Sequence, residues 1–181
     1  MKTKIKIALV VTVICLFIMH HYEVALHAIG VNDKLDMNFG YTFSQMSDVF
    51  QILHRNDSRI YFAYITVDFI FIISYLFVQK YFLMYAIGEN AINTKWKYLL
   101  YTVYFRAAFD VMEDLMFLYL FFYISKNMAW IVIVASFITK LKFIMLWTWM
   151  ASLLLSIVLH IKYRGGTKIE NSRFVLFFRN R

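Results

Sequence analysis

The chain of 181 residues contains no proline, and its five glycines all lie outside the long apolar runs. Proline and glycine are the residues that most readily interrupt a helix, so the apolar runs predict unbroken helices. Carriers that bind their substrate at mid-membrane usually depend on helices broken by glycine or proline. The sequence therefore disfavours a carrier of that kind.

Cysteine is also scarce, since Cys15 stands alone and cannot form an intramolecular disulfide. We expect it to be a buried thiol. The sequence shows no Ser-His-Asp spacing, no phosphate-binding loop and no nucleotide fingerprint. We therefore expect a non-enzymatic protein that needs no cofactor. Residues far apart in the sequence can still assemble a catalytic site, so enzymatic activity stays open.

Apolar residues, in contrast, are abundant: the chain is 62% hydrophobic and 20% aromatic, with a mean hydropathy of +0.62. Soluble domains average about 45 to 50% apolar. Four apolar runs, at about residues 7–29, 60–78, 98–123 and 128–161, are each long enough for the roughly 20 residues that cross a bilayer. The predicted fold is an all-α integral membrane four-helix bundle in one domain, residues 1–164. A basic-aromatic tail, residues 165–181, should then lie on the inner membrane surface.

The basic residues are distributed unevenly around these runs. Three precede the first run, three lie between the second and third, and six follow the fourth, so twelve of 19 fall on one side. The other side carries Lys34, Arg55, Arg59 and Lys126. The positive-inside rule then places both termini in the cytoplasm, and we expect a multi-pass plasma-membrane protein. The net charge of +8 indicates attraction to anionic membrane lipids; nucleic acid is not an expected partner, because the basic residues are split among three short segments.

The first 19 residues also fit a signal peptide, which has a basic start and an apolar core. The segment Ala28-Ile29-Gly30 would be its small-x-small cleavage site, about eleven residues past the apolar run. Because three histidines and a glutamate intervene, we rank a first membrane span above this alternative.

A short amphipathic helix is predicted between the first two runs. Phe43, Met46, Phe50 and Leu53 recur at spacings that place them on one helical face. Thr42 and Gln45 have the spacing of a capping box. We expect this helix at the outer side of the membrane, with Ser44, Asp48 and Gln51 turned toward water. It either covers the helix ends as a packing element or acts as a lid over a substrate.

The third run carries four ionisable groups: Arg106, Asp110, Glu113 and Asp114. At roughly 2.5 to 3.5 kcal/mol per charge, they raise the insertion free energy by about 10 kcal/mol, of which its twelve Leu, Val and Phe residues offset roughly 4 to 7. This run should therefore be the least willing of the four to enter a membrane. Spacings of three and four residues crowd these groups on one side of the helix, so they need partners there.

The partners are expected on the neighbouring runs. The fourth run offers Lys140 and Lys142, which face opposite sides of a helix, so only one can point at the acids. We choose Lys142, because it belongs to a polar stripe with Thr139, Trp149, Ser152, Ser156 and His160. Asp68, in the second run, lies at a similar depth and completes the predicted cluster.

Two interpretations of this cluster remain open. It is either a buried charge network that fixes the register of the helices, or a site for a lipid, a small amphiphile or proton handling. The first favours an accessory, protective or interaction protein with an unknown protein partner. The second favours binding, transport or modification of an amphiphilic ligand at the cluster.

A second polar group lies near the outer end of the first run. His20, Glu23 and His27 share one helical face and have residue types that zinc uses. They are weak candidates for a metal site, because no second cysteine and no HExxH pattern accompanies them. Imidazoles and a carboxylate also suit a membrane interface, so we expect no metal.

Several short motifs together resemble those of a family of small four-span membrane proteins without an established activity. They are Phe39-Gly40-Tyr41-Thr42, Arg59-x-Tyr61, Asp68, Asp110-x-x-Glu113 and Thr139-x-x-Lys142, and they cover residues 39–147. The resemblance implies that Asp68, Asp110, Glu113 and Lys142 belong together, but it implies no reaction. The family has Asn more often where this chain has Asp114, so the extra acid is a departure that alters the charge balance.

Overall fold

The computed structural model describes residues 2–32, 35–87 and 97–165, and these residues form an all-α structure without a strand. Its five α-helices are α1 (Lys2–Ala28), α2 (Phe43–Arg55), α3 (Ser58–Ile87), α4 (Lys97–Tyr123) and α5 (Ala129–Gly165). Two short 3-10 turns, Leu35–Met37 and Lys126–Met128, precede α2 and α5. The predicted tail from residue 166 onward and the side chains of Lys34, Ser156 and His160 lie outside what the structure describes.

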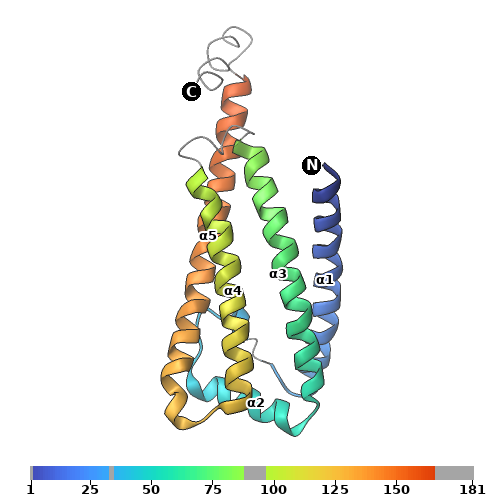
Figure 1. The fold of residues 1–181 in the computed structure, drawn as a ribbon, viewed down its shortest axis with the longest axis vertical. Helices are drawn as coiled ribbons and strands as arrows, with labels where there is room; N and C mark the ends of the chain where they lie inside the picture. Colours follow the sequence, from blue (N-terminus) through green and yellow to red (C-terminus); the bar gives the residue numbers. More distant parts are fainter. Residues whose placement is uncertain (1, 33–34, 88–96, 166–181) are drawn as a thin grey trace.

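Four long helices run side by side, and the short α2 crosses one end of the assembly (Figure 1). Helix α1 packs against α3, α4 packs against α5, and α3 contacts both α4 and α5. The start of α1 and the end of α5 lie at the same end of the molecule, opposite α2 (Figure 1). Thr12 of α1 donates a hydrogen bond to Ser74 of α3, with 3.0 Å between the two hydroxyl oxygens. Helix α1 is therefore joined to the rest of the fold mainly through α3.

Three of the helices are long and apolar enough to cross a membrane: Thr3–Ala28, Ser58–Met84 and Ala129–Leu155, each with a mean hydropathy of 1.9. Helix α4 does not reach that standard, as expected from the charges in its centre. The composition of these helices indicates a membrane protein. Length and composition alone do not show a fourth crossing by α4.

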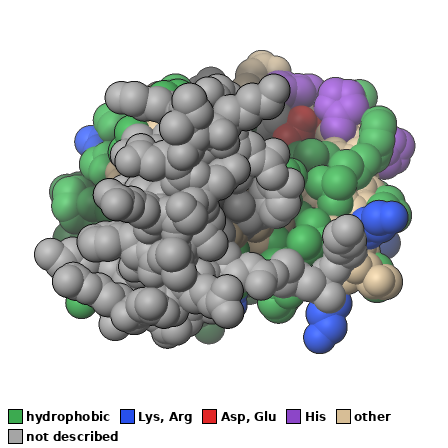
Figure 2. All heavy atoms as spheres, turned by 90° about the horizontal axis from the view of Figure 1, so that it is seen from above, with side chains coloured by type: hydrophobic (Ala, Val, Ile, Leu, Met, Phe, Trp, Pro, Cys, Tyr) green, Lys and Arg blue, Asp and Glu red, His purple; other side chains and the backbone are tan. Residues whose placement is uncertain are grey.

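The outward faces of the long helices are strongly apolar. On α1, Phe17 is 73% exposed, and eight other large apolar side chains of this helix are also exposed: Ile7, Leu9, Val10, Val13, Ile14, Leu16, Ile18 and Val24. Seen along the helices, hydrophobic side chains are visible at both edges of the molecule, next to His, Lys and Arg side chains (Figure 2). Soluble monomers rarely expose contiguous apolar patches of this kind, so these faces suit contact with lipid.

The predicted amphipathic helix is confirmed as α2. Its buried face carries Met46, Val49, Phe50 and Leu53, while Ser44, Asp48 and Gln51 lie on the opposite, more accessible side as expected. The capping box is also present, since the Thr42 hydroxyl accepts from the Gln45 amide and the Gln45 side chain accepts from the Thr42 amide. Phe50 packs edge-on against Phe121 of α4, with ring centroids 5.5 Å apart. Helix α2 thus closes one end of the bundle.

The segment before α2 is fixed against α5 at Gly40. The Tyr41 amide donates to the Ser136 hydroxyl oxygen at 3.0 Å, and Gly40 has a φ of +103°. A Cβ added at Gly40 would lie 2.6 Å from the Lys140 Cε atom and 3.1 Å from the Ser136 oxygen. Only glycine combines this backbone conformation with so close an approach to a neighbouring helix.

Replacing Gly40 with alanine is expected to destabilise the protein by about 1 to 2 kcal/mol through backbone strain, with a further cost from displacing α5 side chains. Gly30→Ala is the matched control, because Gly30 has a φ of +96° but nothing within 4 Å of its added Cβ. The free energies of unfolding of both variants can be measured in detergent. Equal losses would show that the contact with α5 contributes nothing.

The loop between α2 and α3 ends in an exposed ion pair. The Arg59 side chain donates to both carboxylate oxygens of Asp57, at 2.9 and 3.1 Å, and the Arg59 amide also donates to Asp57 at 3.0 Å. These hydrogen bonds hold the pKa of Asp57 below its ordinary value. The stabilisation is present above the ordinary pKa of aspartate and is lost as the pH falls through the lowered value.

In Arg59→Gln, the pKa of Asp57 is expected to rise back toward that of a free aspartate. An NMR titration of the Asp57 carboxyl carbon in the wild type and in the variant measures the change. An unchanged Asp57 titration would mean that the Arg59 side chain does not stabilise the carboxylate. The effect on overall stability should be small, because the pair is exposed and screened by solvent.

Candidate functional site

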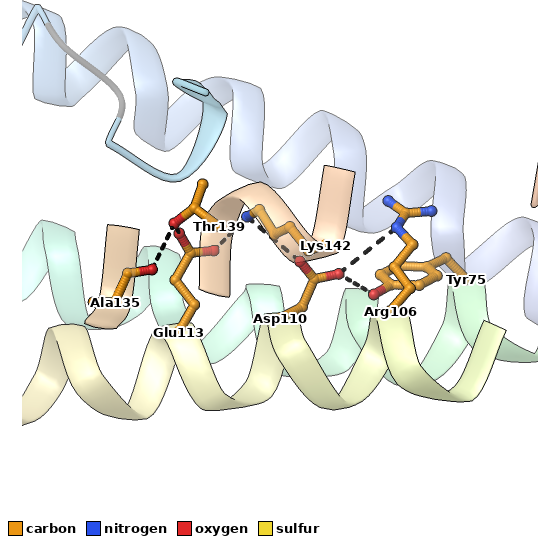
Figure 3. Close-up of polar contacts among 7 residues, drawn as sticks. All are labelled: Tyr75, Arg106, Asp110, Glu113, Ala135, Thr139 and Lys142. Carbon is orange, nitrogen blue, oxygen red and sulfur yellow. Dashed lines mark hydrogen bonds and ion pairs between the residues drawn. The ribbon is translucent and has the colours of Figure 1, made fainter. Parts of the chain in front are cut away.

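The predicted charge cluster forms where α4 and α5 pack side by side. On α4, Arg106 and Asp110 are four residues apart and Glu113 follows three later, so all three share one face. On α5, Thr139 and Lys142 are three residues apart and meet that face (Figure 3). Asp110 is at the middle of the 27-residue α4, so the cluster lies near its mid-length.

Glu113 is the most buried acid of the cluster, with only 1% of its side chain exposed. It accepts a hydrogen bond from the Thr139 hydroxyl on one oxygen and from the Lys142 ammonium on the other. Thr139 is itself fully buried and also contacts the Ala135 carbonyl at 3.1 Å. The carboxylate is therefore held by two donors from a single helix.

Asp110 extends the network toward α3. Its carboxylate lies 3.4 Å from the Lys142 nitrogen and 3.9 Å from the Arg106 Nε atom. The Tyr75 hydroxyl of α3 donates a hydrogen bond to the same carboxylate. The Arg106 guanidinium in turn lies over the Tyr75 ring, 4.4 Å from its centroid. Asp110 thus links three helices.

The four charged side chains alternate in sign and balance. Along the row in Figure 3 the order is Glu113, Lys142, Asp110 and Arg106, which amounts to two negative and two positive charges. Each is at most 17% exposed. A buried ion pair is tolerated when its geometry is good and further hydrogen bonds satisfy its members, and Thr139 and Tyr75 supply such bonds here. We call these six residues the charge network.

The expected contact of Lys142 with the acids is present, and Lys140 faces elsewhere, beside Gly40. The other two acids of the predicted cluster are not among the residues whose contacts Figure 3 draws. Asp68 is half-buried on α3, within electrostatic range of Tyr75 and of Cys15 on α1. Asp114 follows Glu113 directly, is 4% exposed, and lines a cavity on another side of α4.

That cavity has a volume of about 50 Å³ and is enclosed by residues of α1, α2, α3, α4 and the segment after α1. Two acids lie on its wall, Glu23 from α1 and Asp114 from α4. The other lining residues are Leu26, His27, Val31, Leu35, Val49, Leu53, Tyr61, Tyr64, Ile65 and Phe117. We call it the Asp114 cavity. Asp110 and Glu113 are not among its lining residues.

Two of the three weak metal candidates of α1, Glu23 and His27, line this cavity, whereas His20 is not among its lining residues. The His20 Nδ1 atom lies 3.6 Å from a Glu23 oxygen, and the His27 ring is 3.5 Å from the Asn32 side-chain oxygen. In the part of the chain that the structure describes, no three His, Cys, Asp or Glu side chains converge in a way that could hold a metal ion. Glu23 and His27 are better interpreted as cavity residues.

The sequence assigns no site role to three tyrosines, although Tyr61 belongs to one of its motifs. Tyr75 completes the charge network, while Tyr61 and Tyr64 form part of the Asp114 cavity. Tyr75 follows Asp68 by seven residues, two helical turns on the same face, so this spacing could have identified it. Tyr61 and Tyr64 face the cavity that α1 helps to enclose, but nothing in the sequence shows that α1 packs on α3.

Comparisons with protein-family models, with curated proteins and with solved structures find no match.

Proposed function

We propose that the protein is a four-span plasma-membrane protein with both termini in the cytoplasm, and that its role is non-enzymatic: accessory, protective or interaction. The charge network supports the fourth span. Two acids of α4 meet a lysine of α5, so α4 enters the bilayer as a neutralised pair with α5 rather than as an isolated charged helix. Its 27 residues are long enough to cross.

The arrangement of the helices supports the orientation. The start of α1 and the end of α5 share one end (Figure 1), and Lys4 and Lys6 lie at that end of α1. This end is the cytoplasmic one in our proposal, because basic residues are retained on that side. Helix α2 and the exposed pair of Asp57 and Arg59 then lie at the outer surface.

One observation supports the non-enzymatic role: both acids of the charge network already have hydrogen-bond or ion-pair partners within the protein. Its acids are occupied by Lys142, Thr139, Tyr75 and Arg106, and the Asp114 cavity does not reach them. Chemistry at Asp110 or Glu113 would require breaking these contacts. The network is thus suited to fixing the register of α4 against α5.

A deletion strain complemented with chosen variants tests this role. Lys142→Met with Glu113→Gln removes one charge of each sign and should still insert, fold and restore the wild-type phenotype. Lys140→Met, outside the network, is the control for expression. A double variant that folds and inserts but fails to complement would contradict the proposal and would assign chemistry to the pair.

A second candidate function is binding, transport or modification of a lipid or small amphiphile. The Asp114 cavity favours it, because ligand sites are concave, mostly apolar and carry a few convergent polar groups. The site would then lie at the Asp114 cavity and not at Asp110 and Glu113, where the charges occupy one another.

A further inference from the structure

We propose that the Asp114 cavity binds the primary ammonium head of a single-chain amphiphile. The inference deepens the second candidate function and rests on it, but it is independent of the role of the charge network. Three properties of the cavity wall carry it: its charge, its aromatic faces and its size.

The charge of the wall selects a cation. Glu23 and Asp114 contribute carboxylates from two helices, and none of the twelve lining residues is Lys or Arg. Asp114 is 4% exposed, so an opposite charge placed beside it acts through little water. An ammonium group, which carries three donors and no acceptor, complements carboxylate oxygens. The wall is thus suited to a cation and opposed to an anion.

Aromatic side chains reinforce this preference. Tyr61, Tyr64 and Phe117 all line the cavity and are all at most 9% exposed. A cation within about 6 Å of a tyrosine or phenylalanine face is attracted by the ring quadrupole, most strongly where water is excluded. Two carboxylic side chains and three rings from the same cavity therefore favour the same kind of ligand.

The size of the cavity narrows the choice among cations. One water requires about 10 to 15 Å³ of such volume, so about 50 Å³ holds roughly three to five water-sized groups. A primary ammonium and its first carbon fit this space. A trimethylammonium group is bulkier by three methyl groups and has no N–H to donate. The cavity should therefore discriminate between these two head groups.

The rest of the wall suits an alkyl chain. Besides His27, six aliphatic residues complete the lining: Leu26, Val31, Leu35, Val49, Leu53 and Ile65. Glu23 is only half-buried and His27 lies one turn further along α1, so the wall reaches the surface along this helix. A chain leaving the cavity there meets the apolar outer face of α1, where Val24 is 56% exposed. One amphiphile can thus place its head in the cavity and its tail in lipid.

Equilibrium dialysis of radiolabelled dodecylamine tests the inference, with the full chain in nanodiscs of zwitterionic lipid and empty nanodiscs as background. We expect saturable binding with a stoichiometry near one. Asp114→Asn and Glu23→Gln should each weaken it by about tenfold or more, the loss of one charge-assisted contact. Asp48→Asn is the matched control, because Asp48 is an acid on α2 outside the cavity.

A further variant separates the cavity from its charges. Val49→Phe fills the space without altering either acid, and it should also abolish saturable binding. If Asp114→Asn fails to fold, Glu23→Gln and Val49→Phe still test binding at the cavity. Glu23 is only half-buried, so its replacement should not prevent folding. Retention of wild-type binding by Glu23→Gln and Val49→Phe would overturn the site.

Competition between amphiphiles with different head groups identifies which head group the Asp114 cavity binds. Unlabelled dodecylamine should displace the label, dodecyltrimethylammonium should do so poorly, and dodecanol should have no effect. Displacement by dodecanol as effective as by dodecylamine would overturn the ammonium inference while leaving amphiphile binding in place. Absence of saturable binding by any of the three would overturn both.

Discussion

Lys142→Met is expected to lower the free energy of unfolding by roughly 3 to 5 kcal/mol, because it leaves the Glu113 carboxylate buried without its counter-charge. Glu113 is 1% exposed, so water cannot take over the role of the ammonium. Asp110 loses the same cation, although Arg106 and Tyr75 remain beside it. Reversible unfolding in mixed detergent micelles measures the change.

Lys140→Met is the matched control, since it makes the same substitution two residues earlier, outside the charge network. Adding Glu113→Gln to Lys142→Met should recover most of the loss, because the introduced amide is neutral and its oxygen can still accept from Thr139. If the double variant is no more stable than Lys142→Met, or if Lys140→Met costs as much, the pair does not stabilise the fold in this way.

Phe50→Ala is expected to cost about 3 to 5 kcal/mol, the usual range for removing a buried phenylalanine. Phe50 is 1% exposed and packs edge-on against both Phe121 and Tyr61, at centroid distances of 5.5 and 6.2 Å. The variant leaves a cavity where α2 covers the bundle end. Equilibrium unfolding gives the cost, and hydrogen exchange shows whether the amides of α2 lose protection first.

Phe39→Ala supplies the comparison for Phe50→Ala. Phe39 is 64% exposed, and its ring lies 6.0 Å from that of Phe143. Phe39→Ala should lower the free energy of unfolding by about 0.5 kcal/mol, which is far less than the cost of Phe50→Ala. Similar losses in the two variants would mean that α2 is not held by its buried face.

Local patterns predicted much of the fold. The period of Met46, Phe50 and Leu53 identified α2, and the Thr42 and Gln45 pair identified where it begins, because both depend only on helical geometry. Helical geometry also means that only one of Lys140 and Lys142 can face the acids, and the polar stripe that includes Thr139 favours Lys142. These predictions needed no knowledge of the tertiary arrangement beyond which helices are neighbours.

The division of the acids could not be predicted in this way. Asp114 was expected to join Asp110 and Glu113, but successive residues on a helix point about 100° apart, and α4 has different neighbours on its two sides. Asp114 faces the cavity that α1 helps to enclose. The position of α1 beside α3 depends on packing along both helices, for which the sequence carries no short-range signal.

The spacing along the chain between Glu113 and Lys142 has a consequence for how the protein is made. The lysine is synthesised 29 residues after the glutamate, so the growing chain exposes the acids of α4 before their counter-charge exists. If α4 crosses the bilayer as we propose, its insertion should depend on α5, because the counter-charge of Glu113 and Asp110 becomes available only once α5 has been made. The two helices are then expected to enter the membrane together as a hairpin.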